Sequence, residues 1–205
     1  MGENQCQLNF AAGVTGRIRE LFGRDIGGAQ LAAAAGALDG AQVEFKLKRS
    51  DELLAIIKHP YIISQVRSFR RDKAGNLCVF NEEFTKHPLA PPNLGALALW
   101  RQVQAARELG LAYIETYAAG DPRSASRYGY YVWAVYGFNG PLYVGERRIM
   151  PPELRVARDL NQLIELGGDW WWRRNGGERK MIFDLAEESA STRILQNYLK
   201  RKGLL

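Results

Sequence analysis

The first hydrophobic residues of the chain recur at helical spacing. Val14, Ile18 and Leu21 are separated by three or four positions, as on one face of a helix. Residues 10–38 are therefore predicted to be helical. Glycines within residues 23–28 interrupt the pattern, so two short helices are expected.

The period changes at residue 42. Val43, Phe45 and Leu47 alternate with charged residues, which predicts a half-buried strand. The later elements are predicted in chain order: a segment at 53–58 that fits helix or strand, a hairpin of 64–71 and 76–84, a helix at 94–109, a strand at 112–117, a helix at 124–135, a strand at 141–150, a helix from 151 to 166, a strand at 180–185, and a helix at 192–202 capped by Ser189 or Ser191.

This order of elements predicts a mixed α+β fold, with a central mixed, twisted sheet flanked by helices. No linker divides the chain, so we expect a single domain. It would comprise an N-terminal helical segment (1–40), a core (41–150) and a C-terminal helix-strand-helix extension (151–205). The extension is rich in apolar residues and should pack on the core, with residues 170–172 as the hinge of that contact.

The centre of the chain resembles the GNAT superfamily, the Gcn5-related N-acetyltransferases. A strand, a loop ending in Asn-Leu-Gly-Ala at residues 93–96 and a long helix are followed by a strand and a helix that closes on Tyr-Gly-Phe at residues 136–138. The likeness covers roughly residues 42–147. It implies a GNAT-like sheet and acyl transfer from acetyl-CoA to an amine.

The resemblance also implies a cofactor site. In that family a glycine-containing turn and the following helix N-terminus hold the pyrophosphate of acetyl-CoA, because unpaired backbone N–H groups attract anions there. The corresponding residues here are Asn93, Leu94, Gly95, Ala96 and Leu97. The family's turn begins with Arg or Gln and carries more glycine, whereas this one contains two prolines.

Catalytic candidates follow from the same resemblance. A general base should be a carboxylate on a central strand, and Glu82, Glu83 and Glu115 qualify. Strict alternation would place Glu82 and Glu83 on opposite faces of the sheet. Trp133 stands where many family members have a proton-donating tyrosine, so the nearby Tyr131 is the candidate acid.

Charge adds a second set of interpretations. The chain has 28 Lys and Arg against 22 Asp and Glu, for a net charge of +6, which favours an anionic partner. Residues 170–174, Trp-Trp-Trp-Arg-Arg, could offer a surface for stacking or for a protein partner, or could be a hydrophobic clasp. Two alternatives to an enzyme follow: a non-catalytic binding or structural protein, for example of a viral or mobile element, and a nucleic-acid-binding module.

Other classes of protein are less consistent with the sequence. Two histidines and two distant cysteines lack the spacing of a zinc site, so no metal is expected. The longest uncharged run, residues 29–38, is about half the length needed to span a bilayer. The chain start lacks the layout of a signal peptide, and we expect a cytoplasmic protein without a membrane partner.

Overall fold

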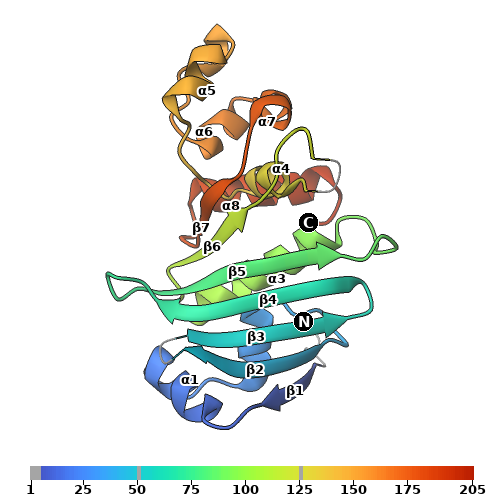
Figure 1. Cartoon of the computed structure of the whole chain (residues 1–205), viewed down its shortest axis with the longest axis vertical. Helices are drawn as coiled ribbons and strands as arrows, with labels where there is room; N and C mark the ends of the chain where they lie inside the picture. The colour runs from blue at the N-terminus through green and yellow to red at the C-terminus, as the bar shows by residue number, and fades with distance from the viewer. Residues whose placement is uncertain (1–5, 50–51, 125–126) are drawn as a thin grey trace. The chain divides into compact units, whose positions relative to one another are not determined.

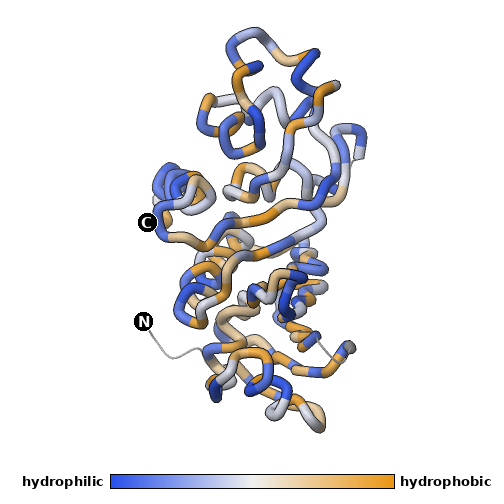
Figure 2. The backbone as a smooth tube through the Cα atoms, turned by 90° about the vertical axis from the view of Figure 1, so that its left-hand side faces the viewer, coloured by the Kyte–Doolittle hydropathy of each residue, from blue (hydrophilic) through white to orange (hydrophobic). Residues whose placement is uncertain are grey.

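A computed structural model describes residues 6–49, 52–124 and 127–205. The chain divides into two compact units, Met1–Ile114 and Glu115–Leu205. Hydrophobic and hydrophilic residues are interspersed along the backbone of both units (Figure 2). Strands and helices are mixed in the chain, which confirms the α+β class.

The first unit is built on a sheet whose consecutive members pair in the order β1 to β5. β1 runs parallel to β2, and the other pairs are antiparallel. The strands are β1 (Gln7–Phe10), β2 (Gln42–Arg49), β3 (Glu52–His59), β4 (Ile62–Arg71) and β5 (Leu77–Lys86). The sequence pattern did not indicate β1, which is mostly exposed.

Alternating burial shows that residues 53–58, which the sequence allowed as helix or strand, form a strand. Leu53, Ala55 and Ile57 of β3 are all at most 2% exposed, with less buried residues between them. This period of two is that of a strand. β3 pairs with β2 on one side and β4 on the other, so its backbone groups are used in both directions.

Helices lie against one face of this sheet. The two N-terminal helices that the sequence predicts are α1 (Val14–Phe22) and α2 (Gly28–Ala34). The long helix α3 (Leu94–Glu108) packs beside α2, and Figure 1 shows both behind the strands. Buried Val14, Ile18 and Leu21 confirm the predicted face of α1.

Strand β6 (Tyr113–Ala118) crosses the boundary between the units. Within the first unit, the N–H of Ala112 donates to the carbonyl of Leu77, 2.8 Å away. The second unit then contains α4 (Gly129–Val135), α5 (Val144–Ile149), the 3-10 turn η1 (Pro152–Leu154), α6 (Leu160–Glu165), α7 (Asp169–Asn175), β7 (Arg179–Asp184) and α8 (Ala190–Arg201). The expected helix at 124–135 therefore begins later, at Gly129, and its residues 125–126 lie outside the described residues.

Aromatic side chains hold the second unit together. Tyr130, Phe138, Trp172 and Phe183 are all at most 1% exposed. The ring of Phe138 lies 5.4 Å from that of Phe183, and the indole N–H of Trp172 donates to the carbonyl of Tyr130 at 3.0 Å. Residues after 152 thus pack on residues before 150 within this unit. The interpretation of the whole chain as one domain stays a prediction.

Two predicted elements of this unit were wrong. Residues 141–150 do not form a strand but contain α5. None of the residues of α5 is buried, so its sequence carries no burial pattern that distinguishes a helix from a strand. The helix expected at 151–166 is split into η1 and α6, because Asp159 starts α6 afresh by accepting a hydrogen bond from the N–H of Gln162. The expected hinge at 170–172 lies within α7. At the end of the chain, Ser189 caps α8 as predicted.

Candidate functional site in the first unit and its counterparts in the second

A β-bulge interrupts the pairing of β4 with β5. Val66 lies opposite Glu83, and Arg67 lies opposite Asn81, so Glu82 is an extra residue on β5. Bulges of this kind are frequent beside active sites, because they re-aim side chains.

The bulge changes which faces the two glutamates occupy. Asn81 bonds Gln102 of α3, and the ring of Phe84 lies 3.3 Å from where a Cβ on Gly95 would stand. Both residues therefore face the helix, although strict alternation over three positions would put them on opposite faces. Glu82 and Glu83, between them, are left to the other face. The expectation that Glu82 and Glu83 lie on opposite faces of the sheet was wrong.

Buried Arg67 spans the bulge. Arg67 is 2% exposed, and its Nη1 donates to the carbonyls of Val66 (3.0 Å) and Glu83 (2.6 Å). Burial lowers the pKa of this guanidinium to about 9. Nε has no hydrogen-bond partner among the described residues. Burying a cation away from water costs free energy, so the hydrogen bonds of Arg67 to the bulge must offset that cost.

The two glutamates differ in their surroundings. Glu82 accepts a hydrogen bond of 2.6 Å from Nζ of Lys48, which also lies 3.4 Å from Glu52. The hydrogen bond with Glu82 raises the pKa of Lys48. Glu83 is exposed. Glu82 is thus held in an ion pair, and Glu83 is the more accessible carboxylate.

The start of α3 is closed by its own backbone. Asn93 adopts the left-handed conformation (φ 62°), and its carbonyl accepts from the N–H groups of both Ala96 (2.9 Å) and Leu97 (3.1 Å). The N–H of Leu94 donates to the carbonyl of Pro91 at 3.3 Å. Proline has no N–H, so Pro91 and its neighbour Pro92 add no donor.

Gly95 is closely packed on the side where a side chain would stand. The residue is buried, and an added Cβ would meet the ring of Phe84 rather than open space. The bond of Leu97 is the ordinary first bond of an α-helix, but the bonds of Leu94 and Ala96 use two of the amides that a helix N-terminus offers to a pyrophosphate. The residues that resemble the family's phosphate site are thus a poor fit for that group.

The remaining candidates belong to the second unit. Glu115, on β6, is 6% exposed and lies 2.9 Å from Nζ of Lys180 on the neighbouring strand β7. Tyr131, on α4, is partly buried, and the guanidinium of Arg173 lies 5.7 Å from its ring. Burial is the main cause that raises the pKa of the Tyr131 hydroxyl. A raised pKa keeps the Tyr131 hydroxyl protonated but makes it a weaker proton donor.

The Tyr-Gly-Phe sequence has a packing role. The ring of Trp133 lies 4.9 Å from that of Phe138. Gly137 has a φ of 93°, and an added Cβ would lie 2.2 Å from the carbonyl oxygen of Ser191 on α8. The glycine is therefore needed where the turn meets the first turn of α8.

Two features were not predicted from the sequence. The first is Arg67, whose signal was an arginine in the middle of a predicted strand. The second is a pocket of about 450 Å³ in the second unit, lined by Asp121, Pro122, Arg123, Arg174, Asn175 and Gly176. Its arginines come from segments far apart in the sequence, so no local motif could reveal it.

No family model, curated protein or solved structure matches this chain. Within the described ranges, no helix combines the length and the apolar character that crossing a bilayer requires. Those same ranges contain no group of three or more His, Cys, Asp or Glu arranged to hold a metal ion. The functional assignment therefore depends on the geometry of the chain itself.

Proposed function

We propose that this protein is a non-catalytic binding protein on an acyltransferase-like core. The observation that carries the proposal is the first turn of α3, where the amides of Leu94 and Ala96 are already bonded to the carbonyls of Pro91 and Asn93. Amides that are already bonded within the chain are poor ligands for a phosphate.

The carboxylates support the same conclusion. Glu82 is paired with Lys48, and Glu115 is paired with Lys180. Both groups are thus better suited to fixing structure than to accepting a proton from an amine.

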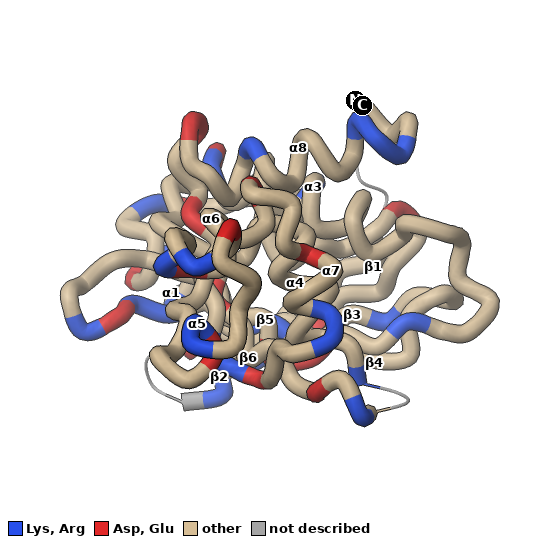
Figure 3. The backbone as a smooth tube through the Cα atoms, turned by 90° about the horizontal axis from the view of Figure 1, so that it is seen from above, with Lys and Arg blue, Asp and Glu red and all other residues tan. Residues whose placement is uncertain are grey.

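The proposed partner is anionic. The net charge of +6 favours such a partner in general. Lys and Arg are nevertheless interspersed with Asp and Glu along the chain (Figure 3), so a local surface rather than the overall charge must provide recognition. A cytoplasmic location, expected from the sequence, is part of the proposal.

One observation favours a second function, N-acyl transfer to an amine. The bulge held by Arg67 places Glu82 and Glu83 on one face of the sheet, and Glu83 is exposed. An exposed carboxylate at such a position could accept the proton of an incoming amine, directly or through water.

Thermal unfolding with added acetyl-CoA separates the two functions. A ligand at about a hundred times its dissociation constant stabilises a fold by roughly 2.7 kcal/mol. We expect the unfolding temperature to stay unchanged at millimolar acetyl-CoA. A rise in the unfolding temperature, together with acetyl transfer that the Glu83→Gln variant abolishes, would instead establish the enzyme.

A further inference from the structure

Helix α7 is anchored on one side and open on the other. Trp171 and Trp172 are 3% and 0% exposed, and Trp172 donates its indole N–H to the carbonyl of Tyr130. The hydroxyl of Tyr130 in turn donates to the carbonyl of Arg173 at 2.6 Å. Trp170, by contrast, is 48% exposed.

Trp170 and Arg174 share the open side of α7. They are four positions apart and therefore lie on one face of the helix, with Arg173 beside them. Both arginines are exposed. The inner indoles act as the hydrophobic clasp that the sequence suggested, and the outer one remains available to a ligand.

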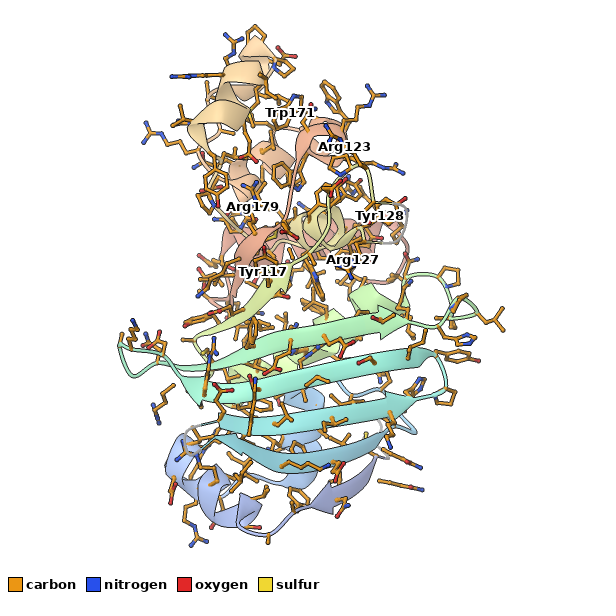
Figure 4. The ribbon with its side chains drawn as sticks, viewed as in Figure 1. Tyr117, Arg123, Arg127, Tyr128, Trp171 and Arg179 are labelled. Atoms are coloured by element: carbon orange, nitrogen blue, oxygen red, sulfur yellow. The ribbon has the colours of Figure 1, made fainter. Side chains whose placement is uncertain are left out.

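The loop between β6 and α4 brings further cations to this region. The N–H of Arg123 donates to the Asp121 carboxylate at 2.7 Å, and the N–H of Arg127 donates to the Ser124 hydroxyl at 3.0 Å. These bonds turn the loop, while the side chains of Arg123, Arg127 and Tyr128 are exposed. Figure 4 shows these three residues on the loop, with Arg123 beside α7.

Arg123 and Arg174 line the same pocket of about 450 Å³, one from each segment. Its volume is within the range of sites for small molecules. Asn175 and Gly176 complete the side formed by the end of α7. Two guanidinium groups on opposite segments can each bond a phosphate in a bidentate manner.

Within the described part of the chain, no Asp or Glu oxygen forms a salt bridge with Arg123, Arg127, Arg173 or Arg174. In the same unit, Arg179 is paired with Glu146 and Arg193 with Glu165. Unpaired guanidinium groups gathered on one surface repel each other, and an anion would relieve that repulsion.

We propose that this surface binds single-stranded nucleic acid. Arg123 and Arg174 would contact phosphates across the pocket, and the exposed rings of Trp170 and Tyr128 would stack on bases. Exposed aromatic faces can reach only bases that are not already stacked in a duplex, so the aromatic residues favour a single strand. The inference deepens the proposed function by naming the partner, but it does not require that acetyl-CoA fail to bind.

The test is fluorescence anisotropy of a labelled twelve-nucleotide oligo-dT with the full chain at several salt concentrations. The double variant Arg123→Ala/Arg174→Ala should bind at least about tenfold more weakly, with a salt dependence reduced by about 0.7 for each lost phosphate contact. Trp170→Ala should weaken binding about tenfold and leave the salt dependence unchanged, because stacking releases no counterions.

Arg148→Ala is the matched control, because it removes an exposed positive charge on α5 of the same unit. It should bind nearly as well as the unaltered chain. Equal weakening by Arg148→Ala, an unchanged affinity of Trp170→Ala, or no binding at low salt would each overturn the inference. Displacement of the oligonucleotide by acetyl-CoA would also overturn it, since the surface would then be a cofactor site. Binding of both ligands without competition would instead retain this inference and contradict the non-catalytic function alone.

Discussion

The side-chain amides of Asn81 and Gln102 exchange two hydrogen bonds, of 3.1 and 2.9 Å, in the interior of the first unit. Asn81 is on β5 and Gln102 on α3, and they are 2% and 1% exposed. A buried polar pair is satisfied in few alternative arrangements, so it fixes how the helix lies along the strand.

Gln102→Leu should lower the free energy of unfolding by about 1–3 kcal/mol, because the amide of Asn81 loses two bonds without gaining contact with water. Urea denaturation measures the change. The double variant Asn81→Leu/Gln102→Leu should be less destabilised than the sum of the two single variants. Additive effects would show that the pair does not act as a unit.

Gly137→Ala should destabilise the second unit by roughly 2 kcal/mol or more. The left-handed φ penalises any side chain, and the new Cβ would approach the carbonyl of Ser191. Gly145→Ala on α5 is the control, since nothing lies within 4 Å of its added Cβ. Thermal unfolding of the two variants distinguishes them, and equal unfolding temperatures would contradict the packing role of Gly137.

Periodicity predicted most of the first unit, because its strands and helices bury regular faces. Val43, Phe45 and the apolar side of α1 are buried where their spacing indicated. It failed at α5, where no face is buried. The spacing of apolar residues in α5 therefore does not indicate which type of element forms there.

The candidate site was predicted less well, because its geometry depends on tertiary structure. Nothing in the sequence Asn-Glu-Glu-Phe shows that Glu82 is an extra residue, which needs the partner strand to be known. The left-handed turn at Asn93 was foreseeable from residue type. The hydrogen bonds made by the amides that follow Asn93 could not be foreseen, because they depend on the backbone geometry of the folded chain.

Arg67→Lys should loosen the bulge of β5. Both bonds come from Nη1, and the side chain of lysine is one bond shorter than that of arginine, so at least one of the bonds to Val66 and Glu83 should be lost. We expect a loss of about 1–3 kcal/mol in urea denaturation and faster amide hydrogen exchange around the bulge. Unchanged exchange in this variant would show that Arg67 does not hold the bulge.

Tyr136→Phe should reduce the loss of stability at alkaline pH. Burial raises the pKa of the Tyr136 hydroxyl above its usual value of 10.0. Above that pH the unfolded chain releases the phenolic proton while the folded chain retains it, so the free energy of unfolding falls as pH rises. Phenylalanine carries no such proton in either state. Unfolding temperatures between about pH 9 and 12 should therefore decline less steeply in the variant; identical slopes would contradict this account.

We propose that this chain binds an anionic partner and does not use acetyl-CoA. Isothermal titration calorimetry of the full chain, with acetyl-CoA and oligo-dT titrated separately in one low-salt buffer, tests it most directly. We expect a saturable heat with the oligonucleotide and none with millimolar acetyl-CoA. Saturable binding of acetyl-CoA that Gly95→Val weakens at least tenfold would contradict it, because the cofactor would then occupy the start of α3.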